Sequence, residues 1–144
     1  MRALLVTALT LVACGGPLEE EADVAPSATA TGSAIGMALQ VRVGTSAGES
    51  GLRNRFAIDQ TDAVYFTATG AQGAGTHTVA FEVYDPSGSM WQRSESTLTG
   101  GRATASMPVA GTWVQQYALT GKWQVLVFVD DAPDAAGQLS FALR

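Results

Sequence analysis

The chain has 144 residues, of which 47% are hydrophobic and only 15% are charged, and its formal net charge is −5. This length suits a single domain, and the acidic balance argues against a nucleic-acid partner, because phosphate binding needs a basic surface. One cysteine and one histidine exclude an intramolecular disulfide and a zinc centre built from four such ligands. We therefore expect no cofactor.

The first residues have the layout of a secretory signal peptide. Arg2 precedes the apolar run ALLVTALTLVA, which is shorter than the ~20 residues of a membrane-spanning helix. The run closes with Leu11-Val12-Ala13-Cys14. This resembles the lipobox of bacterial lipoproteins, in which an aliphatic residue, a small or branched one, and Ala or Gly precede the cysteine. The alternatives are an ordinary signal peptide with an incidental cysteine and an N-terminal core helix.

The lipobox resemblance implies a lipid anchor at Cys14. In that family the thiol receives a diacylglyceryl group, the signal peptidase cuts before the cysteine, and the new amine is acylated. We therefore predict a lipoprotein signal peptide over residues 1–13. Three acyl chains bind a membrane far more firmly than the marginal attachment that one provides. Gly15 stands where Asp retains such proteins at the inner membrane, so the resemblance implies the outer membrane of a bacterial cell envelope.

Residues 14–35 are predicted to hold the lipidated cysteine and a disordered acidic tether. The segment GGPLEEEADVAPSATATGSAI is rich in small residues, has no hydrophobic period, and holds four of the 13 acidic residues. It cannot bury enough apolar surface to offset the entropy lost on ordering. Its like charges extend it away from an anionic lipid surface. The alternative is that the acidic run caps a helix.

Residues 36–144 are predicted to form the folded domain, because apolar residues recur there with period two, which is typical of half-buried strands. The candidate strands are GMALQVRV, AVYFTAT, THTVAFEVY, SMWQRSESTLT, RATASMPV, GKWQVLVFV and QLSFALR. In GKWQVLVFV, Leu126 and Phe128 lie opposite an apolar face, so we expect a central strand buried on both faces. Seven to eight short strands predict an all-β fold, a single Ig-like antiparallel β-sandwich.

Two segments of this domain carry a further resemblance. DPSG at residues 85–88 has the residues of a type I turn, and GKW at residues 121–123 opens the long apolar strand. Together they resemble the macroglobulin-type and fibronectin-like sandwich modules of secreted proteins, in which a strand ends in such a turn and a G-x-W segment enters a long strand. The resemblance implies a module that binds or spaces, and no catalytic residue.

The residues give little support to catalysis. His77, the single histidine, lies between two threonines on a predicted strand, where we expect a structural role. Ser87 and Ser89 lie near a turn but lack the strand–turn–helix context of a nucleophile elbow. We therefore predict that the protein is not an enzyme.

A calcium site is a weak candidate in the loop before the last strand. Asp130, Asp131 and Asp134 supply three carboxylates within five residues, and calcium takes six to eight oxygen ligands. The same segment, punctuated by Pro133 and Gly137, equally has the composition of a hairpin loop.

The chain is predicted to be a non-enzymatic, membrane-anchored envelope lipoprotein whose β-sandwich is a binding or structural module. The alternative is a carbohydrate-binding module displaying Trp91 and Trp113, whose neighbours are polar, whereas Trp123 begins an apolar face. Arg53 and Arg55 are either solvated or in contact with anionic glycans or headgroups. The expected partners are the membrane, through the lipid anchor, and an envelope protein or glycan.

Overall fold

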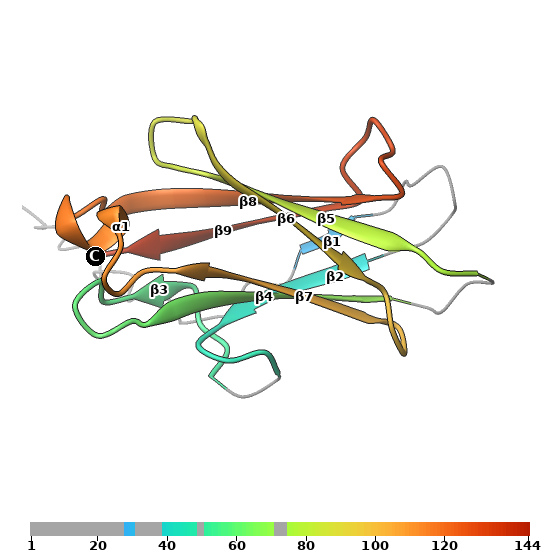
Figure 1. Cartoon of the computed structure of the whole chain (residues 1–144), viewed down its shortest axis with the longest axis horizontal. Helices are drawn as coiled ribbons and strands as arrows, with labels where there is room; N and C mark the ends of the chain where they lie inside the picture. Colours follow the sequence, from blue (N-terminus) through green and yellow to red (C-terminus); the bar gives the residue numbers. More distant parts are fainter. Residues whose placement is uncertain (1–27, 31–38, 49–50, 71–74) are drawn as a thin grey trace, which may run out of the picture.

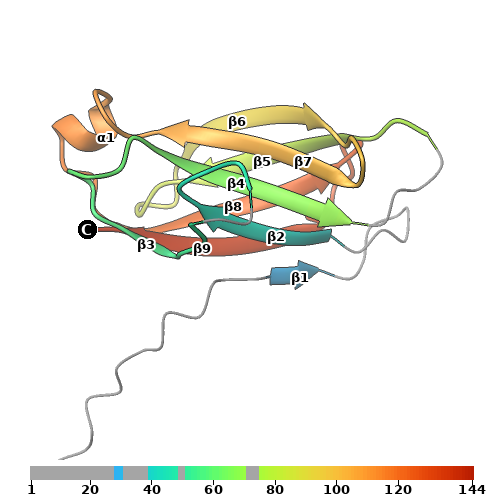
Figure 2. The same ribbon diagram turned by 90° about the horizontal axis from the view of Figure 1, so that it is seen from below.

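The computed structural model describes residues 28–30, 39–48, 51–70 and 75–144, and these form two packed β-sheets (Figure 1). The four-stranded sheet has the order β1-β2-β4-β7, and Figure 2 looks onto it. Its strands are β1 (Ala28–Ala30), β2 (Leu39–Gly44), β4 (Ala63–Gly70) and β7 (Arg102–Pro108). The predicted all-β sandwich is confirmed.

The five-stranded sheet has the order β3-β9-β8-β5-β6. Its strands are β3 (Arg55–Phe56), β9 (Gly137–Leu143), β8 (Gly121–Val129), β5 (Thr78–Tyr84) and β6 (Met90–Thr97). All strand pairs of both sheets are antiparallel except β3 with β9, which is parallel. The weakest strand candidate, SMWQRSESTLT, is an edge strand with mostly exposed or half-buried residues.

The core lies between the sheets, where the predicted apolar faces meet. Phe66 of the four-stranded sheet stacks on Phe81, with ring centroids 6.5 Å apart, and lies 5.8 Å from Phe141. Trp123 stacks in turn on Phe141 at 6.1 Å. Because aromatic side chains bury large apolar areas, these rings join the two layers. Other fully buried side chains are Leu39, Val41, Val43, Val64, Val79, Met107, Val125, Val127 and Val129.

Strand β8 is central, as predicted, but it is not buried on both faces. Leu126 and Phe128 are only half-buried. They point away from the four-stranded sheet, because Val125, Val127 and Val129 fill the core and successive side chains alternate across a strand. The expectation of two fully buried faces is therefore wrong, and β8 leaves a partly open outer face on the five-stranded sheet.

The first strand, β1, lies inside the range assigned to the tether, so the described domain begins before residue 36. Ala28–Ala30 pairs with β2 at the sheet edge. Backbone pairing at an edge needs no hydrophobic period, and for this reason the pattern of the side chains gave no sign of the strand. The predicted signal peptide, Cys14 and the acidic run lie outside the described residues.

One end of the sandwich, here called the α1 end, holds the helix α1 (Trp113–Gln116) and the turn between β5 and β6. Thr112 caps the helix, since its Oγ1 accepts a hydrogen bond of 3.2 Å from the Val114 N–H. The predicted turn at residues 85–88 is present: the Gly88 N–H donates to the Asp85 carbonyl at 2.9 Å. The opposite end, here called the far end, holds residues 98–101 and the loop after β8.

Candidate functional site

The outer face of the five-stranded sheet is arranged in rows set by strand register. Tyr84 of β5 lies opposite Gln124 of β8, and Gln124 lies opposite Ser140 of β9. One row further along, Leu126 of β8 lies opposite Gln138 of β9. Side chains directly opposite each other on neighbouring strands have Cβ atoms about 5 Å apart, so segments distant in sequence meet on one surface.

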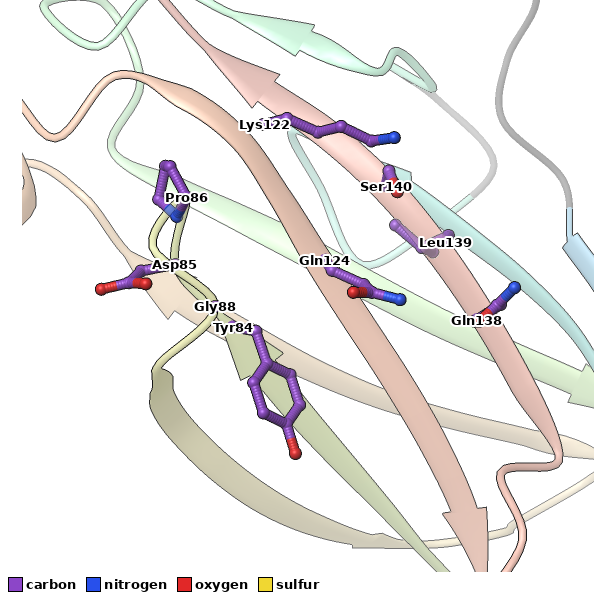
Figure 3. A pocket seen from close by; sticks show the side chains of 9 residues that line it. All are labelled: Tyr84, Asp85, Pro86, Gly88, Lys122, Gln124, Gln138, Leu139 and Ser140. Atoms are coloured by element: carbon purple, nitrogen blue, oxygen red, sulfur yellow. The ribbon is translucent and has the colours of Figure 1, made fainter.

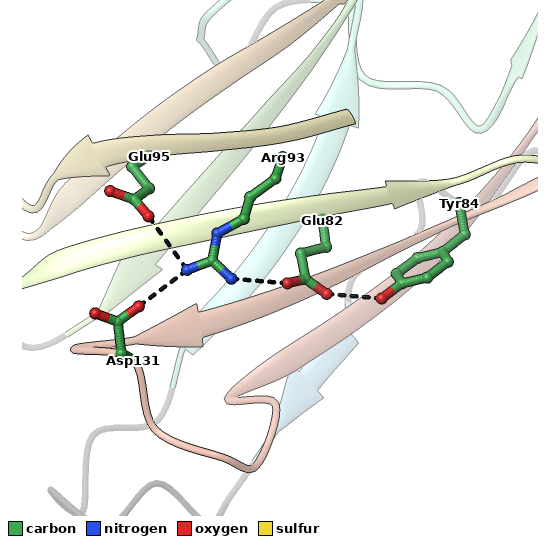
Figure 4. A network of polar contacts seen from close by, with 5 residues as sticks. All are labelled: Glu82, Tyr84, Arg93, Glu95 and Asp131. Carbon is green, nitrogen blue, oxygen red and sulfur yellow. Dashed lines mark hydrogen bonds and ion pairs between the residues drawn. The ribbon is translucent and has the colours of Figure 1, made fainter. Parts of the chain in front are cut away.

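One half of this face is closed by a network of ion pairs, here called the acidic network (Figure 4). The Arg93 guanidinium donates to Glu82 at 2.9 Å, to Glu95 at 3.2 Å and to Asp131 at 2.9 Å. The Tyr84 hydroxyl donates to the second oxygen of Glu82 at 2.7 Å. Each charged or hydroxyl group here therefore has a partner within the fold.

The pKa values in the acidic network follow from these bonds. The hydrogen bond to Glu82 raises the pKa of Tyr84 above its ordinary value, because losing the proton would set two negative charges side by side. The pKa of Arg93 is also raised, first by the hydrogen bond to Glu95 and then by that to Glu82. Tyr84 and Arg93 therefore both keep their protons near neutral pH, which suits a structural role.

The other half of the face is open and contains a hollow of about 520 Å³, here called the polar hollow (Figure 3). It is lined by Tyr84, Asp85, Pro86, Gly88, Lys122, Gln124, Gln138, Leu139 and Ser140. In the part of the chain that the structure describes, the side chains of Lys122, Gln124, Gln138 and Ser140 have no hydrogen-bond partner. Four adjacent polar groups are thus left for solvent or a ligand.

Asp85 at the rim of the polar hollow is committed to its own turn. Its Oδ1 accepts hydrogen bonds from the Ser87 N–H at 2.9 Å, from the Ser89 N–H at 3.0 Å and from the Ser87 hydroxyl. These bonds, first that of the Ser87 hydroxyl, lower the pKa of Asp85 below its ordinary value. The carboxyl group is therefore ionised near neutral pH and is held in the turn.

A second hollow of about 330 Å³ adjoins the first and is here called the cationic hollow. It is lined by Asn54, Arg55, Lys122, Ser140, Phe141, Ala142 and Arg144. Lys122 and Ser140 line both hollows, so the two hollows adjoin at these side chains. Asn54 Oδ1 is the only buried side-chain nitrogen or oxygen without a hydrogen-bond partner among the described residues.

The two tryptophans of the carbohydrate-binding alternative, Trp91 and Trp113, differ in exposure and in packing. Trp113 is 66% exposed and meets the 63% exposed Tyr117 edge-on, with ring centroids 6.0 Å apart. Trp91 is half-buried and packs edge-on against the buried Trp123 at 5.8 Å. No ring contact joins Trp91 to Trp113 within the described ranges. Trp113 is therefore available on the surface, whereas Trp91 is partly covered by its packing against the core.

Two of the three aspartates of the calcium prediction are bound to other residues. Asp130 Oδ2 lies 2.7 Å from His77 Nδ1, and its Oδ1 accepts from the Thr78 N–H at 2.9 Å. Asp131 pairs with Arg93 in the acidic network, while Asp134 is exposed. The described residues contain no group of three or more His, Cys, Asp or Glu placed to hold a metal ion. The loop therefore connects strands and gives no support to a calcium site.

Sequence reasoning overlooked the residues of the polar hollow. Gln124, Gln138 and Ser140 occupy the outward positions of two predicted strands, and nothing in either strand by itself distinguishes them from the solvent-exposed side of an ordinary sheet. Polar residues on both strands would have marked the surface only if the pairing of β8 with β9 had also been known. Their convergence is a property of register.

Among the described residues, no helix is long and apolar enough to cross a bilayer. Trp113–Gln116, the helix at the α1 end, has four residues. Function is inferred from the residues themselves, since no protein-family model and no curated protein sequence matches this chain.

Proposed function

We propose that this protein is a non-enzymatic lipoprotein of the bacterial cell envelope, anchored through Cys14, and that its β-sandwich is a binding module. The ligand site is the polar hollow. The observation that supports this assignment is the set of four adjacent side chains, Lys122, Gln124, Gln138 and Ser140, without partners among the described residues. The acidic network on the same face shows the contrasting case, in which polar groups are used up by the fold.

The chemistry of the hollow suits a ligand rich in hydroxyl groups, such as a saccharide. Each glutamine amide both donates and accepts hydrogen bonds, as does the Ser140 hydroxyl, and a sugar hydroxyl does the same. Exchanging water for ligand at one such group changes the free energy little. Several converging groups are therefore needed, and the register of β8 with β9 places three of them together.

The polar hollow is less suited to catalysis. Asp85 is the one carboxyl group that lines it, and its lowered pKa and turn hydrogen bonds leave it without a proton to donate. His77 lies at the far end of the sandwich, paired with Asp130. A base next to a nucleophile is the usual sign of covalent catalysis, and the lining residues do not supply that pair.

Membrane attachment allows a module with weak affinity to bind its ligand effectively. A lipid anchor confines the domain near other envelope components and raises its effective concentration toward them. Cys14 in Leu11-Val12-Ala13-Cys14 supports the anchor. Binding and anchoring are thus separate properties of two parts of the chain, and each has its own test.

Binding is tested with the full chain in a polyoxyethylene detergent, which contains no sugar, applied to an array of glycans. We expect retention of a defined set of glycans and its loss in the double variant Gln124→Ala/Gln138→Ala. Gln116→Ala is the matched control, because Gln116 is an exposed amide on α1 outside the hollow. An array with no bound glycan, or a double variant that retains the same set, would overturn the site.

A second candidate site is the aromatic pair of Trp113 and Tyr117. Both rings are largely exposed, and their planes meet at 86°, so each presents one flat side on which a sugar ring can stack. Trp113→Ala on the same array distinguishes the two sites. Loss of glycan binding in this variant, with normal binding by Gln124→Ala/Gln138→Ala, would move the site to α1.

A further inference from the structure

We infer that the cationic hollow binds an acidic group of the ligand, so that the ligand class is a saccharide bearing carboxylates. This inference rests on the proposed function, because it extends the polar hollow into its neighbour. Hydrogen bonding in the polar hollow does not distinguish a neutral sugar from an acidic one, and the cationic hollow would add a preference for the acidic sugar.

Strand register builds the cationic hollow from a small residue between two cations. Ala142 of β9 lies opposite Lys122 of β8 on one side and opposite Arg55 of β3 on the other. All three point outward, since the next residues, Phe56, Trp123 and Phe141, are buried. Neighbouring strands lie about 4.8 Å apart, so the Cα atoms of Lys122 and Arg55 lie about 10 Å apart, with a single methyl group between them.

Two of the three cations that line this hollow are not paired within the described residues. Lys122 and Arg144 have no ion-pair partner in the described part of the chain. Arg93 on the same sheet, by contrast, pairs with three carboxylates. Two unpaired cations at one hollow favour an anionic ligand there, although the chain as a whole has a net charge of −5.

The two hollows fit one ligand because they share a boundary. Lys122 and Ser140 line both, with Gln124 and Gln138 on one side and Arg144 on the other. Asp85 is the one carboxylate that lines the polar hollow, and its hydrogen bonds hold it in its own turn. A sugar whose hydroxyls meet the glutamines can therefore direct a carboxylate toward Lys122 and Arg144, where charge-assisted hydrogen bonds are strongest.

The test compares an oligogalacturonide with its fully methyl-esterified form, which keeps the hydroxyls and loses the charge. Binding to the full chain in polyoxyethylene detergent is measured by titration calorimetry. We expect the acidic form to bind about tenfold more tightly than the ester, as two or three exposed charge contacts would give. Raising the salt concentration should reduce this difference, because salt screens exposed charges.

Two variants test separately whether the charge and the open space of the cationic hollow are needed, and a third variant is the matched control. Lys122→Gln removes a cation and should abolish most of the preference, so that the acidic form and the ester bind with similar affinity. Ala142→Leu keeps every charge but fills the hollow and should also remove the preference. Arg102→Gln removes a cation at the far end of the other sheet and should leave the preference intact.

The outcomes distinguish this inference from the proposed function. Equal binding of the acidic and esterified forms, or equal effects of Lys122→Gln and Arg102→Gln, would overturn the inference and leave the polar hollow in place. Failure of both forms to bind overturns the inference for this class. If the glycan array is also empty, the proposed function falls with it. Normal melting curves for Lys122→Gln and Ala142→Leu confirm that the variants are folded.

Discussion

His77 Nδ1 lies 2.7 Å from Asp130 Oδ2, although the two residues are 53 positions apart. The contact joins the start of β5 to the end of β8, the two central strands of the five-stranded sheet. The second oxygen, Asp130 Oδ1, accepts from the Thr78 N–H at 2.9 Å, and the Asp130 N–H donates to the Thr78 carbonyl at 2.9 Å. One aspartate thus closes the far end of the sheet.

The stability contributed by Asp130 should depend on pH. The hydrogen bond from His77, followed by that from Thr78, lowers the pKa of Asp130 below its ordinary value. A carboxyl group whose folded pKa is lowered contributes stability above its unfolded pKa of about 3.9, and this is lost as the pH falls through the folded pKa. Asp130→Asn should therefore lower the melting temperature at about pH 6 and have little effect near pH 2.

Asp134→Asn is the control for this prediction, because Asp134 is an exposed carboxyl group in the same loop. It should leave the melting temperature nearly unchanged at both pH values. A loss of stability in Asp130→Asn that is equally large at about pH 2 would contradict the ionic origin of the contribution.

The two tryptophans of the α1 end and the core should differ strongly in their contribution to stability. Trp123 is fully buried and stacks on Phe141, so Trp123→Ala should cost about 3–5 kcal/mol of the free energy of unfolding. Trp113 is largely exposed, and Trp113→Ala should cost about 0.5 kcal/mol or less. Urea unfolding measures both values. Similar losses in the two variants would contradict the packing described for the core.

Arg93 should stabilise the protein modestly and in a salt-dependent way. Its guanidinium joins Glu82, Glu95 and Asp131, but it is itself 40% exposed, so solvent weakens each pair. Arg93→Met should lower the melting temperature slightly at low salt and less at ~1 M sodium chloride.

The additional change Glu82→Gln tests the same network, since it removes the charge of a carboxylate that has lost its ion pair with Arg93 and keeps only the hydrogen bond from Tyr84. Part of the stability lost in Arg93→Met should return in the double variant. A loss independent of salt would indicate that the arginine acts through packing of its aliphatic chain rather than through charge.

The turn between β6 and β7 offers a matched pair of glycines. Both have positive φ, +60° for Gly100 and +74° for Gly101, but a Cβ on Gly101 would lie 2.6 Å from the Gly70 carbonyl oxygen, whereas a Cβ on Gly100 meets nothing within 4 Å. Gly100→Ala should cost about 1 kcal/mol for the left-handed backbone alone. Gly101→Ala should cost about 1–3 kcal/mol more, because the backbone of β4 must shift. Chemical denaturation of both variants measures the difference, and equal costs would contradict the close approach of the turn to β4.

Membrane attachment should depend on the single thiol. Cells grown with labelled palmitate should incorporate the label into the wild-type protein, and the protein should sediment with membranes. Cys14→Ser should lose the label and the attachment, because a hydroxyl does not replace the sulfur in thioether formation. The label is the decisive readout: an unlabelled wild-type protein, or a variant that sediments as before, would remove the lipid anchor from the proposed function.

The sequence alone determined which residues face the core. Leu39, Val41 and Val43 of β2 alternate with polar residues and are buried. In β5 the same period of two places Val79, Phe81 and Val83 in the core. Alternation decides the face of a strand whatever its partner is, since successive side chains point to opposite sides. The turn at residues 85–88 was predictable for a similar reason: Asp, Pro and Gly act through their own backbones.

Only the tertiary structure decided which outward residues meet. Strands β5 and β8 pair although β6, β7 and α1 lie between them in the chain, and period two contains no information about neighbour or register. The row of Tyr84, Gln124 and Ser140, and the small Ala142 between Lys122 and Arg55, follow from that pairing. The exposure of Trp113 and the partial burial of Trp91 likewise depend on what packs against each ring, because both tryptophans have polar neighbours in sequence. Local chemistry fixed the strands and turns, while contacts between distant segments fixed the surface that a ligand would meet.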